Sequence, residues 1–159
     1  MRRENSQRKF LGRVYALAVT PDDRFIISGS QDKSIKISHL KTGEIHHHFK
    51  DIHEGLYFVK GILSQRNPIE TVRSLKLTPD GRYLISASAD KMIKIIDIEE
   101  KKQVYSFNAH PRWIKCIDVS SDGKFFASCS DDRSIKIFDF KTKQLVHWFK
   151  NAHDGKFSS

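Results

Sequence analysis

The sequence has few cysteines and no long hydrophobic run. Its two cysteines, Cys116 and Cys129, are too few for the disulfide framework of a small secreted domain, and we expect both to be buried and reduced. No stretch of about 18 apolar residues occurs, which excludes a membrane-spanning helix and predicts no membrane insertion. Residues 1–9 lack the apolar core of a signal peptide. We therefore expect a soluble, intracellular protein, cytoplasmic rather than nuclear.

Acidic residues are outnumbered, because 19 aspartates and glutamates stand against 28 lysines and arginines, for a formal net charge of +9. Together with Arg2, Arg3, Arg8 and Lys9 near the start, this charge suits an acidic partner such as a nucleic acid, an anionic membrane or an acidic protein surface. Most lysines, however, occupy alternating strand positions or turns, where they are solvated and protect strand edges from mispairing. The charge therefore leaves RNA binding open without requiring it.

The sequence does contain an internal repeat. Residues 28–37 (SGSQDKSIKI) return as residues 86–95 (SASADKMIKI) and again as residues 128–137 (SCSDDRSIKI). The aspartates that anchor the three copies lie 58 and then 42 residues apart. The second interval matches the length of about 40 to 45 residues that one propeller blade occupies.

Each copy has the pattern of four short strands. An apolar lead-in runs into a turn rich in Pro, Asp and Gly, which suits a tight hairpin because these residues tolerate the dihedral angles of the turn. The second strand is apolar on both faces, so it must be covered on both sides, as in a blade stacked between two others. The expected strands are residues 14–19, 25–27, 35–37 and 44–49, then 72–77, 83–85, 93–95 and 103–107, then 114–119, 125–127, 135–137 and 144–149.

From about Val14 onward, the repeats resemble the WD-repeat family. The dipeptide that closes the third strand in that family is represented by Ser38-His39, Ile96-Asp97 and Phe138-Asp139, so Trp is missing each time and Asp is kept twice. The family's His ahead of the first strand appears as His110, and His53 and His153 lie at the equivalent places. The resemblance implies an all-β fold, a β-propeller of about three four-stranded blades that form an open arc of an incomplete ring.

The repeats also set the expected organisation of the chain. The expected parts are a basic N-terminal segment at 1–12, blade 1 at 13–53, an apolar insertion loop at 54–70, blade 2 at 71–109, blade 3 at 110–150, and the start of a further repeat or a tail at 151–159. Closed propellers have about 4 to 8 blades. We therefore expect exposed apolar surface on the outer blades, and further blades or a second copy of the chain to close the ring.

His110, Ser128 and Asp132 have the residue types of a hydrolase triad. The same Ser and Asp types recur in the other copies, which favours a hydrogen-bond network repeated in each blade, and the resemblance implies the same network. The residues assigned to this structural network are His110, Ser128, Asp132, Ser86, Asp90, Ser28 and Asp32. We expect no catalytic residue and no cofactor.

His46, His47, His48 and the nearby His53 are of the type that binds zinc. Adjacent residues of a strand point to opposite faces, so the three consecutive histidines cannot meet at one metal ion. We expect no metal site.

The resemblance implies a partner-binding face, lined by the residues that flank the first apolar position of each blade and by the residue before the turn Asp. Tryptophan, tyrosine and arginine are the residue types most often found at interface hot spots, which makes Trp113 the strongest candidate. The residues carried over are Arg13, Tyr15, Thr71, Arg73, Trp113 and Lys115, then Gln31, Ala89 and Asp131.

The insertion contributes an apolar segment on the same face, including Leu56, Tyr57 and Phe58. Such side chains lower solubility when exposed, so either the insertion folds onto the blades or a partner covers it. The leading hypothesis is thus a non-catalytic scaffold that binds other proteins through the top face of its blades. The alternative is an RNA-associated subunit of a ribonucleoprotein particle, which would use the basic charge.

Overall fold

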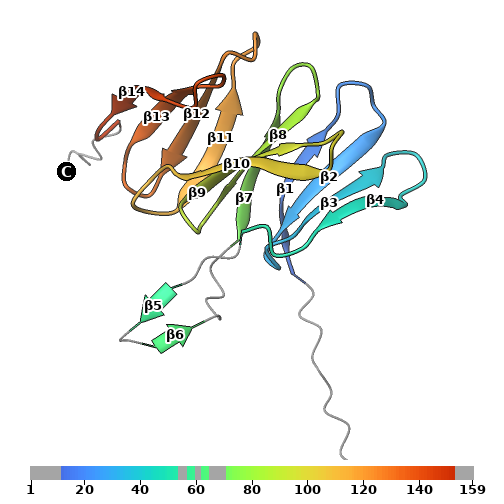
Figure 1. Ribbon diagram of the computed structural model, residues 1–159, viewed down its shortest axis with the longest axis horizontal. Helices are drawn as coiled ribbons and strands as arrows, with labels where there is room; N and C mark the ends of the chain where they lie inside the picture. The colour runs from blue at the N-terminus through green and yellow to red at the C-terminus, as the bar shows by residue number, and fades with distance from the viewer. Residues whose placement is uncertain (1–11, 54–56, 60–61, 65–70, 153–159) are drawn as a thin grey trace, which may run out of the picture.

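The computed structural model describes residues 12–53, 57–59, 62–64 and 71–152, which form strands, turns and loops. Three four-stranded antiparallel sheets, the blades, follow one another along the chain, and within each sheet every strand pairs with the next (Figure 1). The expected all-β architecture is confirmed.

The blades have closely similar strand boundaries. The first blade consists of β1 (Val14–Val19), β2 (Phe25–Ser30), β3 (Ile35–His39) and β4 (Ile45–Phe49). The second consists of β7 (Val72–Leu77), β8 (Tyr83–Ser88), β9 (Met92–Asp97) and β10 (Lys102–Asn108). The third consists of β11 (Ile114–Val119), β12 (Phe125–Ser130), β13 (Ile135–Asp139) and β14 (Leu145–Phe149). A separate hairpin of β5 (Tyr57–Val59) and β6 (Ile62–Ser64) lies between the first two blades in sequence.

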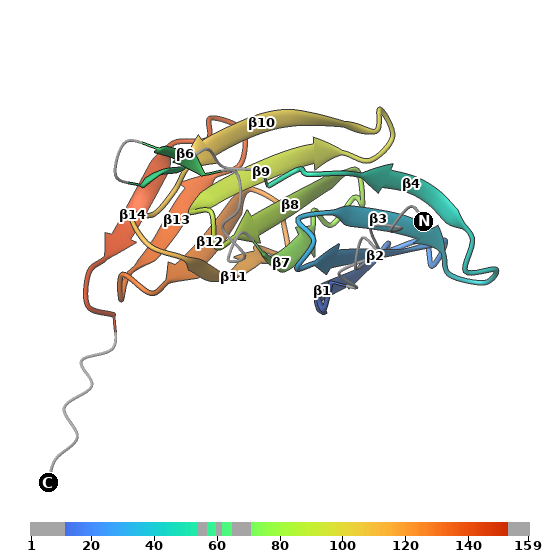
Figure 2. The same cartoon turned by 90° about the horizontal axis from the view of Figure 1, so that it is seen from below.

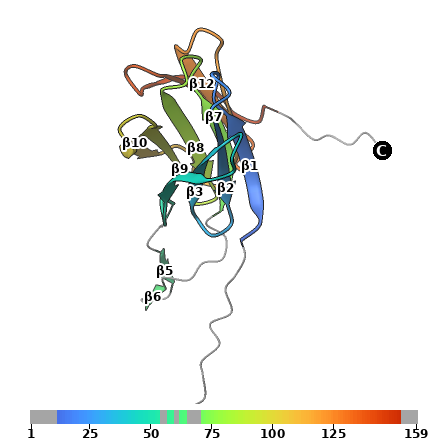
Figure 3. The same ribbon diagram turned by 90° about the vertical axis from the view of Figure 1, so that its right-hand side faces the viewer.

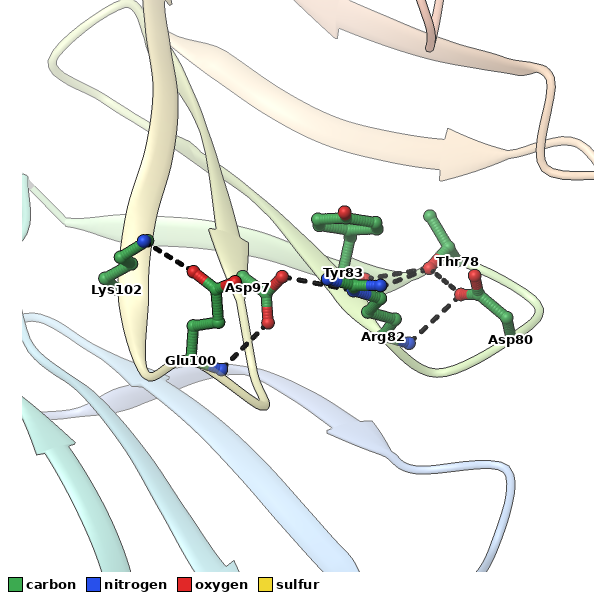
Figure 4. A network of polar contacts seen from close by, with 7 residues as sticks. All are labelled: Thr78, Asp80, Arg82, Tyr83, Asp97, Glu100 and Lys102. Atoms are coloured by element: carbon green, nitrogen blue, oxygen red, sulfur yellow. Dashed lines mark hydrogen bonds and ion pairs between the residues drawn. The ribbon is translucent and has the colours of Figure 1, made fainter.

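A short polar side chain closes the first hairpin of each blade. In the second blade, the Thr78 hydroxyl donates to Asp80 Oδ1 (2.5 Å) and accepts from the backbone N–H of Tyr83 (3.0 Å), as Figure 4 shows. Thr20 and Ser120 make the same pair of bonds in the other two blades. These bonds satisfy backbone groups that a tight turn leaves without ladder partners, so the local sequence defines the hairpin.

The aspartates of the third-strand dipeptide close the turn into the fourth strand. Asp97 Oδ1 accepts from the backbone N–H of Glu100 (2.9 Å), and its Oδ2 accepts from Arg82 Nε (3.1 Å; Figure 4). Asp139 Oδ1 likewise accepts from the backbone N–H of Thr142 (2.7 Å). The Asp of the dipeptide therefore keeps its structural role where the neighbouring Trp is absent.

The three blades lie side by side with their apolar faces in contact. Figure 2 shows the inner strands β1, β7 and β11 along one edge, and β4, β10 and β14 fanned out on the other. In the side view of Figure 3, the inner strand β1 and the outer strand β10 lie at opposite margins. Burial of one Ile, Leu or Phe side chain stabilises a fold by about 1.5–3 kcal/mol, so these contacts hold the arc together.

Two hydrophobic clusters occupy the spaces between blades. In the first cluster, Ile27, Ile35 and Ile37 of the first blade meet Val72, Leu75 and Leu84 of the second. In the second cluster, Ile85, Ile93 and Ile95 meet Ile114, Ile117 and Phe126 of the third.

The side of the first blade that faces away from the second is uncovered by the described residues. Leu17 is 61% exposed, whereas Leu75 and Ile117, at the same position of the next two blades, are 3% and 1% exposed. On the outward side of the third blade, Ile135 and Ile137 are only half-buried. These exposures confirm the prediction of apolar surface on the outer blades.

The two cysteines of the third blade are less buried than the sequence predicts. Cys116 and Cys129 are free, as expected, but Cys116 is exposed and Cys129 half-buried, so the expectation that both are buried is wrong. Ala87, the counterpart of Cys129 in the second blade, is buried between blades. The thiols lack such cover because no described blade follows. Burial remains sufficient to raise the pKa of Cys129.

No helix in the described part of the chain has the length and hydrophobicity needed to cross a bilayer.

Candidate partner-binding face

The first strand of each blade begins with a β-bulge. The strand register shifts at Tyr15 in β1, at Arg73 in β7 and at Lys115 in β11, so these three residues have no direct partner on the neighbouring strand. A bulge redirects the side chain of the extra residue out of the pleat. The same backbone irregularity thus presents one side chain from each blade at the starting end of the inner strands.

Backbone hydrogen bonds bring the other predicted face residues to the same end. The N–H of Asp131 donates to the carbonyl of Trp113 (3.0 Å), and the N–H of Gln31 donates to the carbonyl of Arg13 (2.8 Å). The corresponding bond in the second blade joins Ala89 to Thr71 (3.1 Å). We call the surface formed by Arg13, Tyr15, Arg73, Trp113, Lys115 and Asp131 the strand-start face.

Arg73 connects the three blades across this face. Its guanidinium carbon lies 5.1 Å from the ring centre of Tyr15 in the first blade and 6.0 Å from that of Trp113 in the third. Cation–π contacts of this kind contribute about 0.5–1 kcal/mol at exposed sites and more where water is excluded. The Nε atom of Arg73 is buried and has no hydrogen-bond partner among the described residues.

Lys115 completes the third-blade part of the face. Its Nζ lies 5.5 Å from the Trp113 ring and 3.0 Å from Asp131 Oδ2. Both charged side chains are substantially exposed, so their ion pair contributes little to stability. Its main effect is to neutralise the one carboxylate that lies beside Trp113 on this face.

Some of the residues that the family resemblance assigns to the partner-binding face are buried. Thr71 and Ala89 are buried, which leaves a partner little of their side chains to contact, whereas Arg13 is exposed and Gln31 half-exposed. In the insertion, Tyr57 and Phe58 lie in β5 opposite Ser64 and Leu63 of β6, and Leu56 lies outside the described residues. Figure 1 draws this hairpin on the side of the molecule from which β7 starts.

Two buried hydrogen-bond networks lie between neighbouring blades. His110 bonds through Nδ1 to Asp132 Oδ2 (2.7 Å) and through Nε2 to Ser128 Oγ (2.8 Å). His53 makes the same contacts with Asp90 (2.7 Å) and Ser86 (2.8 Å). The histidine follows the last strand of one blade and bonds to the next blade, so each network also ties neighbouring blades together.

The electrostatics of the third-blade network favour a neutral imidazole. Burial lowers the pKa of His110, and the bond with Asp132 only partly offsets this effect. Burial by itself would raise the pKa of Asp132, but hydrogen bonds from Ser134 and His110 outweigh it and lower that pKa. Asp132 therefore stays ionised while it accepts from the neutral ring.

Each network is connected like a catalytic triad, but its serine hydroxyl is not accessible to a substrate. Ser86 is 0% exposed and Ser128 2%, so a substrate cannot reach either hydroxyl without opening the blades. The first blade has Ser28 and Asp32 without a histidine among the described residues, and Asp32 keeps only the bond from the following serine, Ser34 (2.6 Å), which Asp132 also accepts from Ser134 (2.6 Å). The arrangement suits a structural role.

Sequence reasoning missed two lysines of this region. Lys136 Nζ donates to the carbonyl of Ala109 (2.6 Å), and Lys94 Nζ donates to the carbonyl of Ile52, in each case the residue just before the network histidine. Burial lowers the pKa of Lys94. The signal was present in the repeated Ile-Lys-Ile segment, but alternation by itself indicates a solvated lysine.

The described residues contain no group of three or more His, Cys, Asp or Glu side chains that could hold a metal ion. Two of the three consecutive histidines contact aromatic rings. His46 lies 4.7 Å from the Phe25 ring and His47 lies 4.4 Å from the Phe49 ring, measured between centroids.

A cavity of about 590 Å³ opens between the first two blades at the opposite end of the inner strands. Arg24 and Arg82 contribute to its wall, and each is paired with a carboxylate, Asp22 at 3.8 Å and Asp97 at 3.1 Å. Because its arginines are already paired, this cavity is a weaker candidate for partner recognition than the strand-start face.

Repeated four-stranded blades, a bulged inner strand in each, and His-Ser-Asp networks between blades define a WD-type β-propeller arc. The family model described as WD domain, G-beta repeat, matches the chain at residues 5–37, 64–97 and 101–139. The chain belongs to the WD40 family. Members of this family in general act as scaffolds that bind other proteins, without chemistry of their own.

Similar proteins carry the same repeat. The chain is 33% identical over 91 residues to a WD repeat-containing protein, SL1-17, of Schistosoma mansoni. This match covers 57% of this chain and 25% of that protein. It is 29% identical over 117 residues to the nuclear distribution protein nudF of Aspergillus niger, and this match covers 70% of this chain and 23% of that protein. The match thus spans a quarter or less of either relative.

Among solved structures, the WD40 repeats of RRP9 have the same fold. The two superpose with a TM-score of 0.76 at 24% sequence identity, and the match covers 92% of this chain and 41% of that one. At this level of identity the likeness concerns the fold alone.

Proposed function

We propose that this protein is a non-catalytic scaffold that binds other proteins through its strand-start face. The observation that carries the proposal is the placement of Arg73 between Tyr15 and Trp113, because it joins three blades into one continuous surface. A few hot-spot residues supply most of the binding energy at a protein interface, and tyrosine, tryptophan and arginine are enriched among them. Rigid strands hold these side chains in place, which limits the entropy lost on binding.

The buried polar groups support a scaffold over an enzyme. Ser86, Ser128 and Ser134, whose hydroxyls contact a network histidine, are all buried. The network histidines and aspartates bond to each other between blades. The groups with the residue types of catalysis are thus engaged in stabilising the fold.

Capture of proteins from a cell lysate tests this proposal. Trp113→Ala and Tyr15→Ala should each reduce the amount of captured protein at least about tenfold, since hot-spot truncations cost 2 kcal/mol or more. Trp148→Ala, at a tryptophan of β14 that is 49% exposed, is the matched control and should leave capture unchanged. Capture that survives both face substitutions but is lost with Trp148→Ala would contradict the choice of face.

The net charge of +9 favours RNA as a second class of partner. The basic residues Arg2, Arg3, Arg8 and Lys9 lie outside the described residues, so this alternative rests on composition. Binding to phosphates weakens steeply with added salt because counterions are released. RNA binding that is undetectable at 50 mM salt would exclude the alternative.

We further propose that propeller blades cover the two open sides of the arc, either further blades or those of a second copy. Support comes from positions such as Leu17, which is exposed where its counterparts in the other blades are buried by a neighbour. Exposed apolar surface of this kind favours association.

A further inference from the structure

Arg73 differs from the other aromatic-stacked arginines of the chain. Arg24 lies 5.2 Å from the Phe25 ring and Arg82 lies 5.3 Å from the Tyr83 ring, and each of these arginines is also paired with an aspartate. Arg73 contacts two rings but has no carboxylate partner among the described residues. Arg73 thus lies over aromatic rings as Arg24 and Arg82 do, but it lacks the carboxylate partner that each of them has.

The acidic side chain of the strand-start face, Asp131, does not supply that anion. Asp131 is held by Lys115 at 3.0 Å, which neutralises both groups. The local charge around Arg73 is therefore positive, and the whole chain adds a net charge of +9. An acidic ligand gains from both the local and the long-range field.

The two aromatic contacts also shape what Arg73 can bind. Rings stacked near a guanidinium cover its faces and leave its N–H edges as hydrogen-bond donors. Because Nε of Arg73 is buried, the edge formed by its two terminal nitrogens is the one that a ligand can reach. This edge matches the two oxygens of a carboxylate, which can accept two parallel hydrogen bonds. The partly buried setting strengthens such bonds because less water competes for the donors.

We propose that Arg73 recognises a carboxylate of an acidic peptide segment, from an Asp or Glu side chain or a chain terminus, with Tyr15 and Trp113 packing against the flanking residues. This inference rests on the proposed function and names the ligand class of its face. A row of nucleic-acid phosphates would be matched by several unpaired cations along a groove, whereas Lys115 is already paired beside Arg73.

Binding of defined peptide pools to the full chain tests the inference. The pools share random flanking positions and differ only in a central residue, which is Glu, Asp, Gln, Asn or phosphoserine, and a uridine decamer serves as the RNA probe. The central Glu or Asp pool should bind about tenfold more tightly than the matched amide pool, as expected for one charge-assisted bidentate contact. Equal binding of the acid and amide pools would overturn the inference.

Variants assign the preference to Arg73. Arg73→Gln should abolish the difference between acid and amide pools, and Arg73→Lys, which keeps the charge but not the planar pair of donors, should reduce it. Arg24→Gln, at an arginine stacked on Phe25 at the other end of the strands, should leave the difference intact. If Arg73→Gln does not fold, an undiminished preference in Arg73→Lys decides against a bidentate contact.

The outcomes separate this inference from the proposed function. Loss of protein capture on Trp113→Ala, together with equal binding of acid and amide pools, would keep the scaffold and reject the carboxylate. A phosphoserine pool or the uridine decamer that binds more tightly than the Glu and Asp pools would likewise overturn the choice of a carboxylate.

Discussion

Lys94 and Lys136 show how single residues of the repeat contribute to the contacts between blades. Ile96 and Phe138, in the tryptophan position, are buried and have no polar group to offer. The two lysines instead donate to the carbonyl just before each network histidine. A lysine stem packs against apolar surface while its amine reaches a polar partner, so this contact ties adjacent blades without an indole.

Residue types and spacing were sufficient to predict the network in the third blade. His110, Ser128 and Asp132 were named from the repeat, and the structure brings them within hydrogen-bond distance. His53 was identified only as an equivalent position, because its partners Ser86 and Asp90 lie more than 30 positions further along the chain. The lysine contacts could not be predicted, since their acceptors are backbone carbonyls that carry no sequence signal.

Ser128→Ala should destabilise the fold by about 1–3 kcal/mol, because it leaves the buried Nε2 of His110 without a partner. Ser28→Ala is the matched control at the same position of the first blade, where Ser28 is only half-buried and no described histidine contacts it. The control should change the free energy of unfolding by less than about 0.5 kcal/mol. Urea denaturation measures both, and equal effects would contradict a network confined to the second and third blades.

The buried imidazole makes stability depend on pH. Burial lowers the pKa of His110 in the folded state below its ordinary value of 6.5, so below that pH the unfolded chain binds a proton that the folded chain does not. The free energy of unfolding should therefore fall as pH decreases below about 6.5, by up to about 1.4 kcal/mol per pH unit for this one group. His110→Gln should make the decline shallower. A stability that stays constant from pH 8 to pH 5.5 would contradict a buried neutral histidine.

At the scale of the elements, the hairpin turns also pack one blade against the next. Gly81 has a φ of 72°, and a Cβ on it would lie 2.9 Å from Cδ of Pro21 in the preceding blade. Asp23, at the equivalent turn of the first blade, has a φ of 56° and carries a side chain. Glycine is thus required where a proline of a neighbouring blade approaches the turn.

Gly81→Ala should cost more than Gly43→Ala. Both glycines have a positive φ, so each substitution places a side chain in a left-handed conformation that costs about 1 kcal/mol. Nothing lies within 4 Å of a Cβ on Gly43, whereas one on Gly81 must displace Pro21. Thermal unfolding of the two variants should give the lower Tm for Gly81→Ala. An equal Tm would indicate that the blades do not approach as closely as described.

The strands could be predicted well, and the bulges could not. Apolar lead-ins, polar turns and the Ile-Lys-Ile segments located all twelve blade strands, because strand faces and turns have their own residue patterns. The bulges at Tyr15, Arg73 and Lys115 depend on how two strands pair, and no residue type marks them. The stacking of Arg73 between two other blades depends in turn on that bulge and on the spacing of the inner strands.

At the scale of the whole molecule, the open sides of the arc should govern association. Leu17 and Val14 are 61% and 58% exposed on the side of the first blade that other blades bury. Leu17→Asp should lower the apparent association constant in sedimentation measurements, since it places a charge where an apolar contact forms. Leu145→Asp, at an exposed leucine of the outer strand β14, is the control and should not change it. A chain that stays monomeric at all concentrations would contradict association through the open sides.

Photo-crosslinking from the strand-start face tests its role as the partner-binding surface most directly. A photoreactive phenylalanine derivative replaces Tyr15 in one protein and Trp148 in another, two aromatic positions of similar exposure, 41% and 49%. After capture from a lysate and irradiation, the protein with the label at position 15 should form a covalent adduct with the captured partner, and the protein with the label at position 148 should not. Adducts from position 148 alone, or equal yields from both positions, would contradict a scaffold that binds through this face.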